Sequence, residues 1–171
     1  MSELIKALII DCHGVLIEKF PLREYTEAVK IFLKERGMEG SFERFQSGFG
    51  TMTAAMEYHS MKEDYLKIMD NLPIYLEEDL EIVDLLFNCP CELFLATDSS
   101  RENLQKTLKN AKIPEDLFKL IITGNDVKRG KPETEMYERI ITAHPYIKPE
   151  EWLVIGDRIT DIIPAAKLNL K

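Results

Sequence analysis

Three short apolar runs in this sequence end in residues that carry hydroxyl or carboxylate oxygens. Ala7–Ile10 precedes Asp11, Leu93–Ala96 precedes Thr97 and Asp98, and Trp152–Ile155 precedes Gly156 and Asp157. A continuous apolar run of this length is typical of a strand buried on both faces of a parallel sheet. Because the carboxyl ends of parallel strands meet at one edge, we expect these polar side chains to lie close together.

Helical patterns follow the apolar runs along the second half of the chain. They cover Arg101–Ala111, Glu133–Ala143 and Thr160–Leu168, and a weaker apolar run, Leu120–Ile122, lies between the first two. An alternation of strands and helices favours an α/β fold with a doubly wound, Rossmann-like parallel sheet. Right-handed crossovers would then place a ligand site at the carboxyl edge of the sheet.

The segment from residue 17 to 90 has a different character, because its apolar residues recur at helical spacing. The signals are a stripe from Leu22 to Leu33 stopped by Gly37, a broken pattern over Phe42–Tyr58, a capping box of Ser60 and Glu63, and a stripe from Leu80 to Phe87. We predict that residues 17–90 form a small helical cap inserted after the first strand. Residues 1–16 and 91–171 would then form a discontinuous α/β core.

Composition limits the class of partner. The chain has 171 residues, of which 45% are hydrophobic and 30% charged, as expected for a compact globular protein. A net charge of −8 argues against a nucleic acid polymer as partner. The apolar runs are too short to span a membrane and the first residues do not resemble a leader, so we predict a cytoplasmic location. Cys12, Cys89 and Cys91 are expected to be reduced, buried thiols.

Four segments, in order, resemble the motifs of the haloacid dehalogenase-like (HAD) hydrolases. They are Ile9–Leu16 with its aspartate after a strand, Leu95–Asp98 with a threonine after a strand, Gly130-Lys131-Pro132, and Val154–Asp161 with the pattern Gly-Asp-x-x-x-Asp. Each motif is weak alone, but together they match most of the chain outside the insertion. The resemblance implies a phosphatase-type hydrolase with a helical cap inserted between its first and second motifs.

The resemblance also implies a role for each motif residue. Asp11 would attack phosphorus to form an aspartyl-phosphate that water then hydrolyses. Mg²⁺ would be bound by Asp11, Asp157 and the backbone carbonyl of His13, with Asp161 ordering the metal's surroundings or reaching it through water.

The remaining motif residues would bind the phosphate of a small phosphorylated metabolite. The resemblance assigns this role to Thr97 and to the backbone N–H of Asp98. Lys131 would neutralise charge on both the phosphate and Asp11, and so keep the carboxylate ionised. A nucleotide or sugar phosphate is a reasonable substrate, and the sequence does not fix the oligomeric state.

His13 departs from the family pattern, which usually has a second aspartate at this position to protonate the leaving alcohol. An imidazole has a pKa suited to the same task. The alternative is a catalytically impaired HAD-fold protein that binds a phosphorylated metabolite or a protein partner. A minor alternative is a 2-haloacid dehalogenase, which Gly156-Asp157 disfavours because the resemblance associates this pair with metal binding.

A second departure lies near Lys171. Family members usually continue with a further strand and helix at the edge of the sheet. We therefore expect the edge of the sheet to be unpaired here, at some cost in stability.

Overall fold

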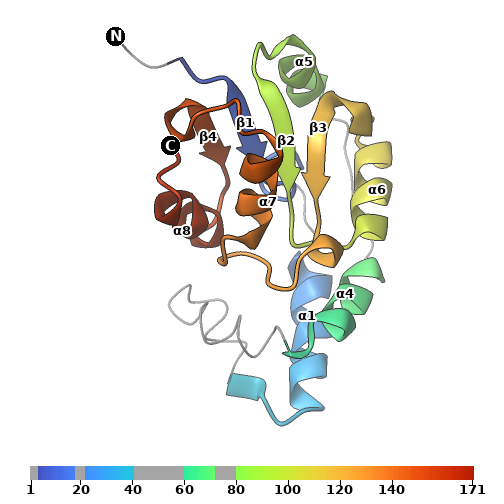
Figure 1. Cartoon of the computed structure of the whole chain (residues 1–171). Coiled ribbons are helices and arrows are strands. Elements are labelled where there is room, and N and C mark those ends of the chain that lie inside the picture. The colour runs from blue at the N-terminus through green and yellow to red at the C-terminus, as the bar shows by residue number, and fades with distance from the viewer. Residues whose placement is uncertain (1–3, 18–21, 41–59, 72–79) are drawn as a thin grey trace.

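The computed structural model describes residues 4–17, 22–40, 60–71 and 80–171. Four strands form one parallel sheet in the order β3-β2-β1-β4 (Figure 1). The strands are β1 (Ala7–Ile10), β2 (Glu92–Ala96), β3 (Phe118–Ile122) and β4 (Trp152–Ile155). The α/β fold and all four predicted strands are confirmed, and β1 and β4 have the predicted limits.

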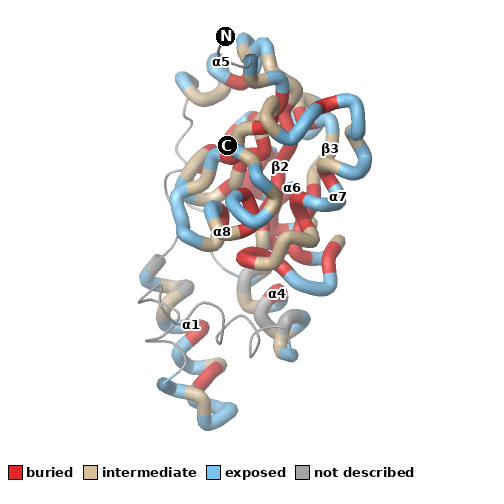
Figure 2. The backbone as a smooth tube through the Cα atoms, turned by 60° about the vertical axis from the view of Figure 1, so that its left-hand side comes forward, coloured by how far each residue is buried: buried red, intermediate tan, exposed pale blue. Residues whose placement is uncertain are grey.

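Both faces of the sheet are covered, which explains why the strands are continuously apolar. Ile9 pairs in register with Phe94 and Val154, and these three side chains face a core cluster completed by α7 (Glu135–Ala143) and α8 (Ile159–Lys167). Ile10 and Leu95 face the other cluster, which receives α6 (Arg101–Asn110) and α5 (Leu80–Asn88). Figure 2 shows the buried positions concentrated along the strands and on the inner helix faces. Helices on both faces make the sheet doubly wound.

The helices that follow the strands begin close to the predicted positions. Ser100 caps α6, and its hydroxyl oxygen accepts a hydrogen bond from the N–H of Asn103 at 3.0 Å. Short 3-10 turns precede β3 and β4 at Glu115–Leu117 and Pro149–Glu151, and a third, Gly124–Asp126, follows β3. Helix α7 begins later than predicted, because residues 131–134 form a turn before it.

Two further helices, α1 (Leu22–Lys34) and α4 (Lys62–Asp70), lie beyond the carboxyl ends of the strands (Figure 1). They pack against one another around Val29 and Leu33. Helix α5 instead lies at the opposite end of the sheet and inserts Leu86 into a core cluster. The division into a cap of residues 17–90 and a core stays a prediction, and the pattern at Phe42–Tyr58 lies outside the described residues.

The outer edge of β4 is partly paired by the last residue of the chain. The N–H of Val154 donates to the carbonyl of Lys171 at 2.7 Å, and the N–H of Lys171 donates to the carbonyl of Trp152 at 3.3 Å. The expectation of a wholly unpaired edge is therefore wrong, because the chain turns back after α8 and runs along β4.

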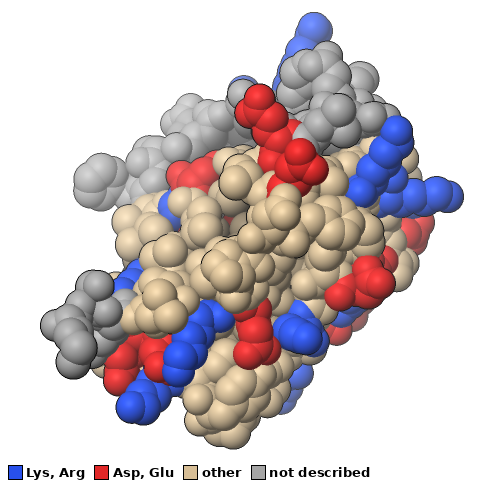
Figure 3. All heavy atoms as spheres, turned by 90° about the horizontal axis from the view of Figure 1, so that it is seen from above, with Lys and Arg blue, Asp and Glu red and all other residues tan. Residues whose placement is uncertain are grey.

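Charged side chains of both signs are interspersed on the face at the amino ends of the strands (Figure 3). Among the described residues, no helix combines the length and the apolar character that crossing a membrane requires.

Candidate active site

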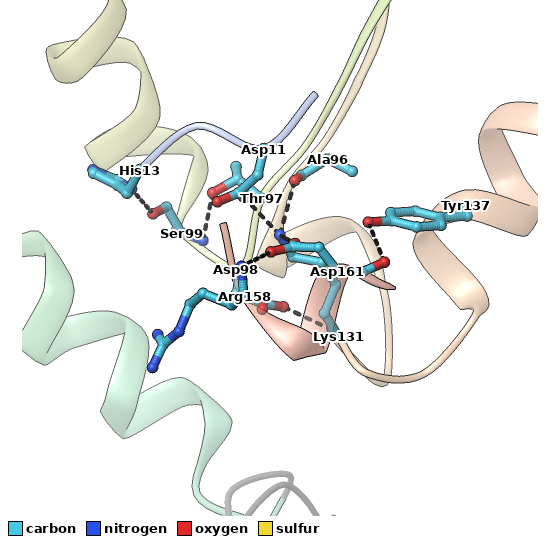
Figure 4. Close-up of polar contacts among 10 residues, drawn as sticks. All are labelled: Asp11, His13, Ala96, Thr97, Asp98, Ser99, Lys131, Tyr137, Arg158 and Asp161. Carbon is cyan, nitrogen blue, oxygen red and sulfur yellow. Dashed lines mark hydrogen bonds and ion pairs between the residues drawn. The ribbon is translucent and has the colours of Figure 1, made fainter. Parts of the chain in front are cut away.

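A lysine and two aspartates from three distant parts of the chain meet at the carboxyl edge of the sheet (Figure 4). The Nζ atom of Lys131 lies 2.6 Å from Oδ1 of Asp11 and 2.6 Å from Oδ1 of Asp161, and it also donates to the carbonyl of Ala96 at 3.2 Å. Burial would lower the pKa of Lys131, but the two carboxylates outweigh it and raise this pKa well above its ordinary value. The carboxylates therefore favour the charged form of the lysine.

Asp161 is the most constrained of these carboxylates. Its Oδ1 accepts from Lys131, its Oδ2 accepts from the backbone N–H of Arg158 at 3.1 Å, and its side chain is 1% exposed. Its own carbonyl accepts a hydrogen bond from the Tyr137 hydroxyl at 3.2 Å. These contacts make Asp161 a support for Lys131.

Asp157 brings a third carboxylate to the group. One oxygen each from Asp11, Asp157 and Asp161 lies within 4.8 Å of the other two, and Asp157 is the exposed member. Three carboxylates against the single ammonium of Lys131 leave an excess of negative charge. Oxygen donors with such an excess fit a hard divalent cation such as Mg²⁺, so these residues could hold the metal that the family implies.

Gly14 permits the close approach of Asp157 to the loop after β1. Its φ is +87°, and a Cβ at this position would overlap the Asp157 carboxylate. Only glycine adopts this conformation easily and also leaves space for the carboxylate. Asp157, a predicted metal ligand, is therefore packed against the backbone of the first motif.

Asp98 positions the backbone of the lysine. Its Oδ1 accepts a hydrogen bond from the N–H of Lys131 at 2.9 Å, and a Cβ at Gly130 would overlap the same oxygen. Burial raises the pKa of Asp98 to about 6, although the nearby Lys131 ammonium and N–H act in the opposite direction. The motif resemblance predicted a role only for the backbone N–H of Asp98 and not for its carboxylate.

Ser99, which had no signal in the sequence, contacts both Thr97 and His13. The buried Thr97 accepts a hydrogen bond at Oγ1 from the N–H of Ser99 at 3.2 Å. The Ser99 hydroxyl lies 3.3 Å from Nδ1 of His13, and Figure 4 shows the imidazole beside Ser99, away from the Lys131 ammonium. Burial lowers the pKa of His13, and the opposing effect of the Asp11 carboxylate is smaller.

Helix α4 contacts the core beside these residues. Its last residue, Asp70, accepts a hydrogen bond from the hydroxyl of Ser100. Its buried Leu66 lies so close to Gly124 that a Cβ there would be 3.1 Å from the leucine Cδ2. The sequence carried no signal for the contact between Asp70 and Ser100, because 30 residues separate the two.

The order of these residues along the chain matches a known family. The sequence profile of the haloacid dehalogenase-like hydrolases matches residues 6–171. The chain belongs to this family. Asp11, Thr97, Lys131 and Asp157 lie in the four segments in which the family motifs were recognised.

Individual proteins that resemble the chain share only a modest fraction of its sequence. The chain is 34% identical over 80 residues to the pyrophosphatase PpaX of Anoxybacillus flavithermus, a match that covers 47% of this chain and 36% of that protein. The chain thus spans about a third of that curated relative. Solved structures cover nearly all of the chain. A Bacteroides fragilis protein described as a haloacid dehalogenase-like hydrolase superposes with a TM-score of 0.71 at 21% identity, covering 98% of this chain and 85% of its own.

The fold is shared by HAD proteins of different activity. L-2-haloacid dehalogenase from Xanthobacter autotrophicus matches with a TM-score of 0.59 at 16% identity, covering 98% of this chain and 76% of its own. The fold alone therefore does not separate phosphate from carbon–halogen chemistry, and the choice depends on the site residues.

Proposed function

We propose that this protein is a Mg²⁺-dependent phosphomonoester hydrolase that acts on a small phosphorylated metabolite through an aspartyl-phosphate on Asp11. The contact between Lys131 and Asp11 carries the proposal. A buried ammonium 2.6 Å from the carboxylate fixes the orientation of its oxygens, which a carboxylate nucleophile needs.

Each residue around Asp11 has its own role in the proposed reaction. Asp11 attacks phosphorus, the ester bond to the leaving alcohol breaks, and water later cleaves the acyl phosphate. Thr97, the backbone N–H of Asp98 and the ammonium of Lys131 bind phosphate oxygens and stabilise their charge as the ester bond breaks. Mg²⁺ held by Asp11, Asp157 and the His13 carbonyl would neutralise the phosphate and align it with the carboxylate. Asp161 holds Lys131 in place.

The cluster of Asp11, Asp157 and Asp161 also favours phosphate hydrolysis over dehalogenation. A haloacid brings one carboxylate to the enzyme and its hydrolysis needs no divalent cation, so the third carboxylate, that of Asp157, would have no role there. A phosphate ester brings two negative charges that must be neutralised before an anionic nucleophile can approach.

A catalytically impaired binding protein is the second candidate, and the position of His13 favours it. The Ser99 hydroxyl lies 3.3 Å from Nδ1 of the buried imidazole, and burial lowers the pKa of His13, so less of it carries the proton that a leaving alcohol needs. Replacing His13 by Asp would restore the usual family residue. A large gain in turnover would support impairment in the natural chain, whereas unchanged or lower turnover would remove this candidate.

The decisive experiment measures phosphate release from a panel of phosphomonoesters and pyrophosphate, which the similarity to a pyrophosphatase makes worth including. Asp11→Asn retains the shape and removes the charge, and Asp116→Asn, at an exposed position before β3, is the matched control. We expect Mg²⁺-dependent turnover that Asp11→Asn abolishes and Asp116→Asn retains. Absence of turnover in the folded natural chain, or turnover indifferent to Asp11, would contradict the proposal.

A further inference from the structure

Two cysteines flank a proline in the connection between α5 and β2. Cys89 follows the end of α5, and Cys91 directly precedes β2. Both are partly exposed, so the expectation that all three cysteines are buried holds only for Cys12. Cys91 and Thr97 lie at opposite ends of β2, roughly 20 Å apart at the usual rise per strand residue. The pair is therefore separate from the candidate active site.

Local hydrogen bonds fix the connection that carries the two cysteines. The Cys91 thiol donates to the carbonyl of Ile5 at 3.4 Å, which fixes it beside the segment leading into β1. The backbone N–H of Cys89 donates to the carbonyl of Leu86 at 3.3 Å in the last turn of α5. A single residue, Pro90, separates the two cysteines, so their Cα atoms are roughly 5–7 Å apart, which is the range that a disulfide spans.

We propose that Cys89 and Cys91 form a reversible intramolecular disulfide when they meet a small disulfide oxidant such as oxidised glutathione. The proposal rests on the single residue that separates the two cysteines and on the partial exposure of both. A thiol that is already beside its partner closes the bond faster than a second oxidant molecule can arrive.

The reaction proceeds in two exchange steps. The Cys89 thiolate attacks one sulfur of oxidised glutathione, which forms a mixed disulfide and releases one glutathione thiolate. Cys91 then loses its proton to solvent and attacks the Cys89 sulfur, which releases the second glutathione. In total, two protein thiols are oxidised and one glutathione disulfide is reduced to two glutathiones.

The order of attack follows from the surroundings of the thiols. Partial burial and the neighbouring Cys89 raise the pKa of the Cys91 thiol, which makes Cys91 the poorer first nucleophile. Cys12 provides an internal reference. Its side chain is fully buried, so glutathione cannot reach the thiol and Cys12 should stay reduced.

Mass spectrometry of the intact chain after incubation with oxidised glutathione tests the proposal. We expect the natural chain to lose the mass of two hydrogens without retaining glutathione, and peptide mapping to place the bond between Cys89 and Cys91. Cys91→Ser should trap one glutathione on Cys89, while Cys89→Ser should react much more slowly. In glutathione buffers the oxidised fraction should follow the ratio [GSH]²/[GSSG], as release of two glutathiones requires.

Three results would overturn the proposal. They are glutathione retained on the natural chain, a disulfide between two chains, and an oxidised fraction that follows [GSH]/[GSSG]. Circular dichroism of both serine variants checks that each is folded. Because no readout depends on phosphate chemistry, failure of the proposed hydrolase activity would leave this test unaffected.

Discussion

The Nζ atom of Lys131 lies 2.6 Å from Oδ1 of Asp11, although 120 residues separate the two in the chain. Asp11 directly follows β1. Its backbone N–H donates to the carbonyl of Ile155 at the end of β4, at 2.9 Å. Lys131 is placed by the loop before α7, which Asp98 holds. The contact thus depends on three strands that end at the same edge of the sheet. It can be tested by substitutions on the lysine side and on the carboxylate side.

Lys131→Met should remove the cation between Asp11 and Asp161 while keeping most of the side-chain volume. Two buried carboxylates would then lack their partner, and breaking such an arrangement costs about 3–5 kcal/mol. We expect turnover to fall by at least about a hundredfold, the usual effect of losing one group that stabilises transition-state charge. Urea unfolding and steady-state kinetics measure the two effects. Lys128→Met, at an exposed position of the same loop, should change neither.

Asp157→Asn and Asp161→Asn separate metal binding from structural support. Asp157 is exposed and close to the other carboxylates, so removing its charge should weaken Mg²⁺ binding by at least about tenfold and leave the unfolding free energy unchanged or higher. Asp161 is buried against Lys131, so its replacement should lower the unfolding free energy by about 2 kcal/mol or more. Calorimetric Mg²⁺ titration and urea unfolding distinguish them. Equal effects of both variants on stability would contradict the division of roles.

Gly14→Ala tests the packing of the first motif against Asp157. Its φ of +87° makes alanine unfavourable by about 1–2 kcal/mol, and the added Cβ would also displace the Asp157 carboxylate. Gly37→Ala is the matched control, because Gly37 has a φ of +67° and open space around the position of the Cβ. Both variants should lose similar stability from the backbone term, whereas only Gly14→Ala should lose Mg²⁺ affinity. Retained affinity in Gly14→Ala would show that Asp157 is not needed at this position.

The sequence predicted the strands and the helices that follow them well, because burial on both faces produces apolar runs such as Ala7–Ile10 that have no other simple explanation. It also indicated which polar residues end those strands. It could not reveal contacts that depend on how distant segments approach. The bond from the Lys131 N–H to the Asp98 carboxylate, and the contact of Asp70 with Ser100, join residues that share no local pattern.

Asp98→Asn should change how stability depends on pH. The Asp98 pKa is raised from 3.8 to about 6 in the folded protein, so between these values the folded state binds more protons than the unfolded state. Stability from this group therefore rises as pH falls from about 6 towards 4, by an amount on the order of 2 kcal/mol. Asparagine still accepts from the Lys131 N–H but does not titrate.

The measurement for Asp98 is the difference in unfolding free energy between the natural chain and Asp98→Asn across this pH range. Other carboxylates titrate in both proteins, so their contributions cancel in the difference. The natural chain should gain stability relative to the variant as the pH falls. A difference that is constant from pH 7 to pH 4 would show that Asp98 does not titrate in this window.

Asp70→Ala tests whether α4 is held to the core through Ser100. The Asp70 carboxylate accepts from the Ser100 hydroxyl, and a hydrogen bond to a charged group contributes about 1.5–3 kcal/mol. Its loss should raise amide exchange in α4 at least about tenfold, with little change in the amides of β1 and β2. Asp64→Ala is the control, because Asp64 lies on the same helix and instead pairs with Arg36 at 3.0 Å. Hydrogen exchange read by mass spectrometry resolves the segments. If Asp70 anchors α4, Asp64→Ala should increase exchange only where α4 meets α1 and leave the α4 amides beside α6 protected. The same exchange pattern in both variants would exclude this anchor.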